Sequence, residues 1–227
     1  MNWMKKITAL ALVSVCSYTA QAQKAVGNPL FLHMHDKMVQ VDKYNDILSG
    51  TVFVDSNWQL GAVLLENGTL VENVRIRINV LDDEIHYIDE SGKEMVSTQN
   101  IKSVIFKKTG NDTTGVFVSK YAFSGKDAGM PGGWMQLLAK GKASLLKKYH
   151  KSIIESKGYS SATVEKNIVT EVRYFVWYNG ELVRVKNVSE VAAAINNPAV
   201  DKQLSNMKKN GKSEMELKAL VDYFNTL

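Results

Sequence analysis

QLGAVLLENGTLVENVRIRINVLDDEIHYIDESGKEMVSTQNIKSVIFKK, residues 59–108, is a series of short strand-like segments that decides the fold of this chain. Apolar and polar residues alternate within the segments, and alternation with a period of two is typical of a strand with one buried face. Residue pairs that favour turns separate the segments: Asn67-Gly68, Asp82-Asp83, Ser91-Gly92 and Gln99-Asn100. The stretch therefore predicts an antiparallel meander.

The segment 74–80 shows this alternation most clearly. Val74, Ile76, Ile78 and Val80 alternate there with Arg75, Arg77 and Asn79. Because successive side chains of a strand point to opposite faces, we expect the aliphatic set in the core. The two arginines are then expected on the exposed face, paired with the acids of residues 82–84. Asn67-Gly68, just before this segment, predicts a type I′ turn, since both central residues of that turn need positive φ.

The overall composition is that of a folded protein without a strong charge bias. The chain has 227 residues, of which 45% are hydrophobic and 22% charged, enough for one sizeable core or two smaller ones. The formal net charge is +5, and the sequence has no run of lysines and arginines of the kind that tracks phosphates. A nucleic-acid partner is therefore disfavoured.

Residues 1–22 have the pattern of a secretory signal peptide. Lys5 and Lys6 precede an apolar run over residues 7–15, and Ala20-Gln21-Ala22 forms a small-x-small cleavage site. Cleavage after Ala22 predicts an exported chain that is periplasmic, associated with the outer membrane or extracellular. The apolar run is too short to cross a bilayer core of about 30 Å, and no later stretch is apolar enough to do so.

The only cysteine of the chain, Cys16, lies within this segment. The alternative to cleavage after Ala22 is a lipoprotein signal with Cys16 as the lipid acceptor. Val15 occupies the preceding position, where such signals resemble one another in having a small residue, so cleavage is favoured. The mature chain then has no cysteine, and its stability must come from burial rather than from disulfides.

Further strands are predicted on both sides of the meander, over residues 30–41, 50–55 and 116–123. Residues 134–156 allow two interpretations. An apolar stripe fits a helix, but Gly141 in its middle costs about 1 kcal/mol relative to alanine. A hairpin with strands over residues 135–139 and 143–149 is the favoured alternative.

The end of the chain predicts a hairpin followed by helices. Residues 169–185 are rich in β-favouring side chains around the turn pair Asn179-Gly180. A helix over residues 188–195 is expected to be capped by Asn187 or Ser189. Pro198 opens a second helix that is expected to reach about residue 210.

A third helix is expected after Ser213, with Glu216 completing a capping box. Its apolar stripe consists of Leu217, Leu220, Val221 and Phe224. We therefore predict an α+β protein, with a β-rich body over residues 23–186 and a C-terminal helical segment over residues 187–227 packed on it.

The hairpin and the helices also carry a resemblance. The segments YFVWYNGELVRVKNVSEVAAAINNP (174–198), LSNMKKN (204–210) and ELKALVDYFNTL (216–227) resemble the C-terminal region of uncharacterised secreted proteins from Bacteroidetes-type bacteria. In those proteins an aromatic hairpin is followed by short helices and a terminal L…YFN, and the turn at Gly92-Lys93 is similar too. The resemblance implies a secreted protein and implies no activity.

His33-Met34-His35-Asp36 is the sharpest candidate for a site. Two histidines two residues apart on a strand share a face, so His33, His35 and the adjacent Asp36 could hold a divalent metal. His86 or His150 could complete the ligand set. The pair resembles that of metal-dependent amidohydrolases, but those enzymes are longer and the rest of their ligand pattern is missing here. The alternative is an exposed pair of histidines near the mature N-terminus.

Three aromatic residues of the C-terminal hairpin, Tyr174, Trp177 and Tyr178, are the candidate partner-binding residues. Their rings could stack on a sugar or on a protein surface, although alternation along a strand places about half of such aromatics in the core. The partner expected from this reading is an envelope protein or a glycan.

No catalytic residue can be assigned from the sequence. No Gly-x-Ser-x-Gly motif is present, and residues 129–133 (GMPGG) lack the Gly-Lys-Ser/Thr ending of a phosphate loop. The predicted function is therefore a non-catalytic binding module of the cell envelope without a cofactor. The alternative is a small metal-dependent hydrolase that uses His33 and His35 to bind a divalent metal. A third hypothesis, a peripheral membrane-surface protein, rests on the mild positive charge alone.

Overall fold

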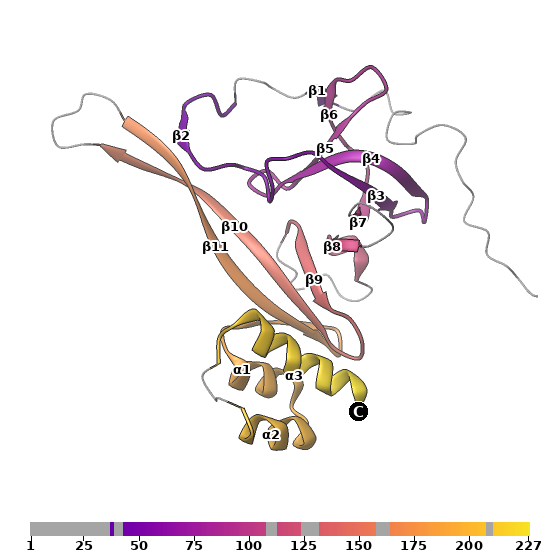
Figure 1. Cartoon of the computed structure of the whole chain (residues 1–227), viewed down its shortest axis with the longest axis vertical. Coiled ribbons are helices and arrows are strands. Elements are labelled where there is room, and N and C mark those ends of the chain that lie inside the picture. The colour runs from indigo at the N-terminus through magenta and orange to yellow at the C-terminus, as the bar shows by residue number, and fades with distance from the viewer. Residues whose placement is uncertain (1–36, 39–42, 108–112, 124–131, 158–163, 208–210) are drawn as a thin grey trace, which may run out of the picture.

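The computed structural model describes residues 37–38, 43–107, 113–123, 132–157, 164–207 and 211–227 (Figure 1). Within those residues, twelve strands form one sheet, and three α-helices follow it. The strands are β1 (Lys37–Met38), β2 (Ile47–Ser49), β3 (Gln59–Leu65), β4 (Leu70–Asn79), β5 (Glu84–Ile88), β6 (Glu94–Val96), β7 (Ile101–Lys107), β8 (Thr113–Val118), β9 (Met135–Ala139), β10 (Ser144–Lys157), β11 (Val164–Tyr178) and β12 (Glu181–Val185). The helices are α1 (Val188–Ile195), α2 (Pro198–Ser205) and α3 (Glu214–Thr226), with a short 3-10 helix η1 (Lys120–Ala122) after β8. The predicted α+β class, a β-rich body with a C-terminal helical cluster, is confirmed.

The predicted meander holds for four successive strands, β3 to β6, which pair in antiparallel order. The next strand, β7, returns to the free edge of β3 instead of pairing with β6. Ala62 and Val63 are neighbours on β3 and both are buried, so this strand is covered on both faces. Burial on both faces is typical of a strand inside a sheet, and β3 has a neighbour on each edge, β4 and β7.

Paired strands and the chain segment that connects β2 to β3 together form a closed circuit. The order is β1-β6-β5-β4-β3-β7-β8-β9-β10-β11-β12, and β2 pairs in parallel with β11. Starting from β3, the paired strands β7, β8, β9, β10 and β11 therefore lead back to β2, which lies just before β3 in the sequence (Figure 1). We call this circuit the strand ring.

The expected strand over residues 50–55 is wrong. Gly50 has a φ of 88°, which interrupts the extended backbone, and regular pairing occurs just before it in β2. Beyond Gly50, Phe53 forms an isolated bridge to Asn79, and the amide of Val54 donates to the oxygen of Ile78 over 2.9 Å. This segment thus extends the β3 side of β4 irregularly, and we call residues 43–58, which contain it, the strap.

The expected type I′ turn at Asn67-Gly68 is also wrong. Gly68 has a φ of 87°, but Asn67 is not among the residues with positive φ. The amide of Gly68 donates to Leu65, and the amide of Leu65 donates to Thr69, so the loop has three residues and ends in a glycine bulge. At Asn179-Gly180 both φ values are positive, 51° and 81°, and the predicted type I′ hairpin is confirmed.

The hairpin interpretation of residues 134–156 is confirmed by β9 and β10. The first strand has the predicted limits, whereas the second continues to Lys157. Asn225 at the end of α3 accepts from the amide of Ala143 over 2.9 Å and donates to its oxygen over 3.0 Å. The same side chain lies where a side chain at position 141 would be, so Gly141 lets the helix end contact the hairpin turn.

The three helices begin as predicted. Asn187 rather than Ser189 caps α1, Pro198 is the first residue of α2, and Ser213 and Glu216 form the capping box of α3. The second helix ends at Ser205, about one turn earlier than predicted, because Asn206 forms its C-cap. The four predicted apolar residues of α3 are all buried.

Two other predicted strands are borne out in part. Of residues 30–41, only 37–38 lie in the described part, where they pair with β6. The strand expected over residues 116–123 begins earlier, at Thr113, and ends at Val118. There Ser119 leaves the extended run and caps η1, accepting from the amide of Tyr121.

The buried apolar residues form three clusters. The largest sheet cluster joins side chains of β3, β4, β5, β7 and β8, with Tyr149 of β10 packed against it. A second cluster joins α1, α2 and α3 to β9–β12 through Leu145, Val176 and Val185. A third covers the opposite face of β9–β11. Among the helices described here, none is both long and apolar enough to cross a membrane.

Candidate functional site

The most elaborate polar arrangement in the described residues lies on β4, β5 and β6. Arg77 lies opposite His86 across the β4–β5 pair, and Glu94 begins the next strand. One carboxylate oxygen of Glu94 accepts from Arg77 Nη2 over 2.6 Å and lies 2.6 Å from His86 Nδ1. The other ring nitrogen of His86 lies 3.3 Å from Glu84. We call these four side chains the Glu94 cluster.

The Glu94 cluster corrects the pairing expected for the arginines. Arg77 does not pair with residues 82–84 but with Glu94, because the sheet register brings β6 beside β5 on this face. Arg75 lies two residues before Arg77 on the same face of β4 and is exposed. Burial raises the pKa of Glu94, but hydrogen bonds from Arg77 and His86 outweigh this effect and hold the pKa below its usual value.

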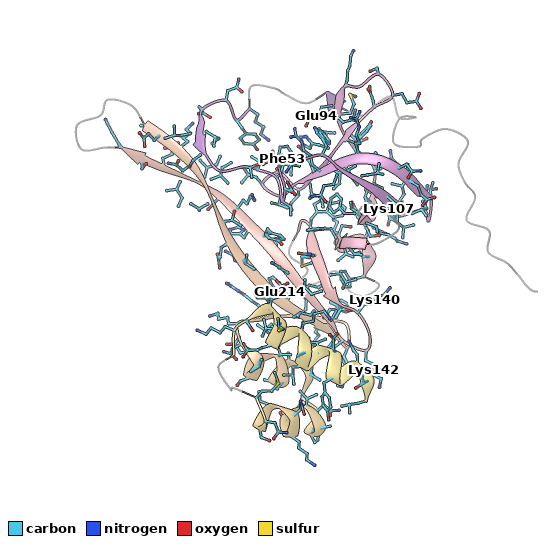
Figure 2. All side chains as sticks on the ribbon, in the orientation of Figure 1. Phe53, Glu94, Lys107, Lys140, Lys142 and Glu214 are labelled. Carbon is cyan, nitrogen blue, oxygen red and sulfur yellow. The ribbon has the colours of Figure 1, made fainter. Side chains whose placement is uncertain are left out.

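Two aromatic rings from the strap enclose the guanidinium of Arg77. Its central carbon lies 3.8 Å from the ring centre of Phe53 and 4.4 Å from that of Trp58. Phe53 also meets His86 edge-on, with ring centres 5.1 Å apart. Figure 2 shows Phe53 and Glu94 at the β4–β6 end of the molecule, far from Glu214 beside the helices. Stacking of this kind orients the cation and excludes water from one side of it.

Asp82, in the turn between β4 and β5, ties down the beginning of the strap. It accepts from Lys43 over 2.7 Å, from the hydroxyl of Tyr44 and from Asn79 over 2.8 Å. Burial alone would raise the pKa of Asp82, and these three donors outweigh it and lower the pKa. Burial, together with the bond to Asp82, raises the pKa of the Tyr44 phenol to about 12.

A cavity of about 1000 Å³ lies between the strap and the β4–β6 face. Its apolar lining comes from Ile47, Val52, Phe53, Val96 and Ile168. Its charged lining comprises the cations Lys43, Arg77 and Lys93 and the carboxylates Asp82, Glu84 and Glu94, with His86 between the two glutamates. Three cations therefore face three carboxylates, and apolar and polar walls face the same space.

The residues predicted to bind a metal are not placed by the structure. His33, His35 and Asp36 lie outside the described residues, so this prediction stays a prediction. His86 belongs to the Glu94 cluster, whereas His150 lies on β10 opposite Glu171. In the part of the chain that is described, no group of three or more histidine, cysteine, aspartate or glutamate residues is arranged to hold a metal ion.

The three predicted partner-binding aromatics lie on β11 and point to different faces. Tyr174 and Tyr178 contact the helices: the hydroxyl of Tyr174 donates to Glu214 over 3.2 Å, and Tyr178 packs edge-on against Phe224. Trp177 lies on the opposite face, 4.9 Å from Phe123 between ring centres. All three remain partly exposed, and their role in binding stays a prediction.

Most residues of this site carry no signal in the sequence that points to one another. Arg77 and His86 lie at equal distances from the turn over residues 80–83, and paired strands place such residues opposite each other, so a turn predicted over those four residues would have linked them. For Phe53 and Trp58 the sequence has no comparable signal, because the strap has no regular alternation of apolar and polar residues from which their positions could be predicted. Comparison of the chain with protein-family models, with curated proteins and with solved structures gives no match, so the resemblance to secreted proteins of Bacteroidetes-type bacteria stays a prediction.

Proposed function

We propose that this chain is an exported, non-catalytic binding module of the cell envelope, and that the cavity beneath the strap holds its ligand. Export is inferred from the positive, apolar and small-x-small pattern of residues 1–22. The observation that carries the binding role is the cavity of about 1000 Å³, which is at the upper end of the range for small-molecule sites.

The lining supports one class of ligand, a small amphiphile without net charge. Apolar side chains such as Val96 and Ile168 suit the apolar part of such a ligand. Several of the ionic groups are already paired with one another, as in Lys43–Asp82 and Arg77–Glu94. A ligand with a full unbalanced charge would leave one of these groups unpaired, which is costly in a partly buried site. A zwitterionic or neutral polar head can instead bridge both signs.

The experiment is calorimetric titration of the purified protein with short-chain phosphocholine, sulfate and trimethylammonium detergents of equal chain length, each below its micelle concentration. We expect the zwitterionic phosphocholine to bind most tightly. Val96→Phe fills part of the cavity and should weaken this binding about tenfold, the equivalent of 1.4 kcal/mol. Val183→Phe is the matched control, since Val183 is an exposed residue of β12 that does not line the cavity.

Equal loss of binding in the two variants, or no binding of any of the three detergents, would refute the cavity as the ligand site. Elemental analysis of the same protein addresses the alternative function. About one zinc, iron or manganese ion per chain, lost in the double variant His33→Ala/His35→Ala, would favour a metal-dependent hydrolase over a binding module.

A further inference from the structure

One edge of β11 is only partly covered. The strand pairs with β10 from Val164 to Trp177. On its other edge, β2 pairs at Lys166 and Asn167, and β12 pairs from Tyr174 onward. Gly50 lies against Ile168, and among the described residues no strand lies beside residues 169–173 on that edge. Five residues of extended chain span about 17 Å, so the gap has the length of a short strand.

The hairpin turn establishes which backbone groups face this gap. Because the loop between β11 and β12 has two residues, Tyr178 and Glu181 form a hydrogen-bonded pair. Every second residue back along β11 then directs its N–H and C=O toward the same side. Thr170 and Val172 therefore present their backbone groups to the gap, while Val169 and Glu171 bond to β10. The oxygen of Ile168 faces Gly50 of the strap, as this alternation requires.

The side chains that border the gap differ between its two faces. On one face, Val172 is 41% exposed and Ile168 is buried. On the other face, beside the exposed Val169, Glu171 bonds to both Arg173 and Arg184, over 2.5 and 2.8 Å, which leaves one positive charge in excess. An excess cation on one face and the aliphatic Val172 on the other therefore indicate which peptide side chains would fit.

We propose that this gap accepts an extended peptide from another protein, in which apolar residues alternate with acidic ones. Added beside β11, the peptide would bond to the N–H and C=O groups of Thr170 and Val172, as in other cases of strand addition to a sheet edge. Its apolar side chains would lie beside Val172, and its carboxylates would lie beside Arg173 and Arg184.

Two other occupants fit less well. A second copy would have to bring its own β11 into the gap, but that strand has fifteen residues and the gap is closed at both ends by β2 and β12. The chain's own residues 23–36 (QKAVGNPLFLHMHD) contain a proline and one acidic residue, and so lack the alternation. This inference concerns backbone edges rather than the cavity and does not depend on the proposed ligand.

The test uses the fluorescein-labelled peptide GVEVEVEVEG and its lysine counterpart GVKVKVKVKG, titrated with the purified protein and followed by anisotropy. The acidic peptide is expected to bind and the basic one to bind at least about tenfold more weakly. Thr170→Pro removes an N–H that points into the gap and leaves the bonds to β10 in place, a position where strands tolerate proline. This variant should weaken binding about tenfold, whereas the control Thr170→Ala should stay within about twofold. Arg184→Glu should weaken binding at low salt and less so at high salt.

Hydrogen exchange keeps the test informative if Thr170→Pro does not fold. The amides of Thr170 and Val172 should exchange quickly in the free monomer and slowly with the acidic peptide bound. Absence of peptide binding, or undiminished binding by a folded Thr170→Pro variant, would overturn the proposal. Slow exchange of both amides in the free monomer would instead show that the chain's own residues cover the edge. A doubled mass in solution that Thr170→Pro abolishes would identify a second copy as the occupant.

Discussion

Lys151 Nζ donates a hydrogen bond to the backbone oxygen of Thr51 over 2.7 Å, and so joins β10 to the strap. The side chain is 9% exposed, and burial lowers the pKa of its ammonium group. A buried donor of this kind is favourable only while its acceptor is in place. The contact therefore marks the point where the strand ring is closed, one residue after Gly50.

Gly50 in the strap is expected to tolerate a side chain less well than Gly68 in the turn between β3 and β4. Gly50 and Gly68 have nearly equal φ values, 88° and 87°, but a side chain at position 50 would collide with Ile168, whereas nothing lies within 4 Å of one at position 68. Gly68→Ala should cost about 1 kcal/mol of unfolding free energy for the backbone strain alone, and Gly50→Ala at least twice as much. Urea unfolding of both variants measures the difference, and equal losses would show that the strap does not pack tightly on β11.

Arg77 is expected to stabilise the fold through its shape as well as its charge. Arg77→Lys keeps the charge but loses the flat contact with Phe53 and Trp58, and should cost about 1–2 kcal/mol of unfolding free energy. Arg75→Lys, on the same strand but exposed, should stay within about 0.5 kcal/mol. Chemical unfolding followed by tryptophan fluorescence checks both values. A loss at position 75 as large as that at position 77 would contradict the role given to the two rings.

The attachment of the strap through Tyr44 should depend on pH at the alkaline end. The pKa of Tyr44 rises from 10.0 to about 12 on folding, so the folded state favours the protonated phenol. Its contribution to stability is full below pH 10 and is lost as the pH rises toward 12. The stability difference between the native protein and Tyr44→Phe should therefore shrink over this interval. Phenolate absorbance of the folded protein should also show one tyrosine fewer in the variant near pH 12; a titration near pH 10 would disprove the shift.

The helical cluster and the sheet are expected to unfold together. Leu220 of α3 is fully buried in the cluster that includes Leu145 and Val176 of the sheet. Leu220→Ala should cost about 2–5 kcal/mol, and Met215→Ala, at an 80% exposed position of the same helix, less than about 0.5 kcal/mol. Helical circular dichroism and tryptophan fluorescence should report one common transition. Two separate transitions would show that the helices form an independent unit.

The N-terminal segment makes a prediction about processing. Mass spectrometry of the protein recovered from the envelope or the medium should find a chain that begins at Gln23, because the small-x-small site ends at Ala22. Ala22→Leu places a large residue at the cleavage position and should leave the precursor uncut. A chain that begins at Cys16 and carries a lipid would establish the lipoprotein alternative instead.

Local features were the part of the fold that could be predicted. The type I′ turn at Asn179-Gly180 and the capping box of Ser213 and Glu216 each depend on φ preferences or hydrogen bonds within a few residues. The failures at Asn67 and Gly50 concern the same kind of signal, but there a glycine bulge and a positive φ were not distinguishable from their alternatives by residue type alone.

The candidate site could not be predicted, because its parts come from distant segments. Val63 and Val104 are apolar in either topology, so residue type alone does not show that β7 pairs with β3 rather than with β6. That choice leads the strands around to β2 and leaves β11 open between β2 and β12. The sequence by itself determined the turns, the caps and the alternation of each strand, since these are short-range preferences. The tertiary structure alone decided the partner of Arg77, the cavity under the strap and the open edge of β11, since strand order depends on which apolar faces bury one another.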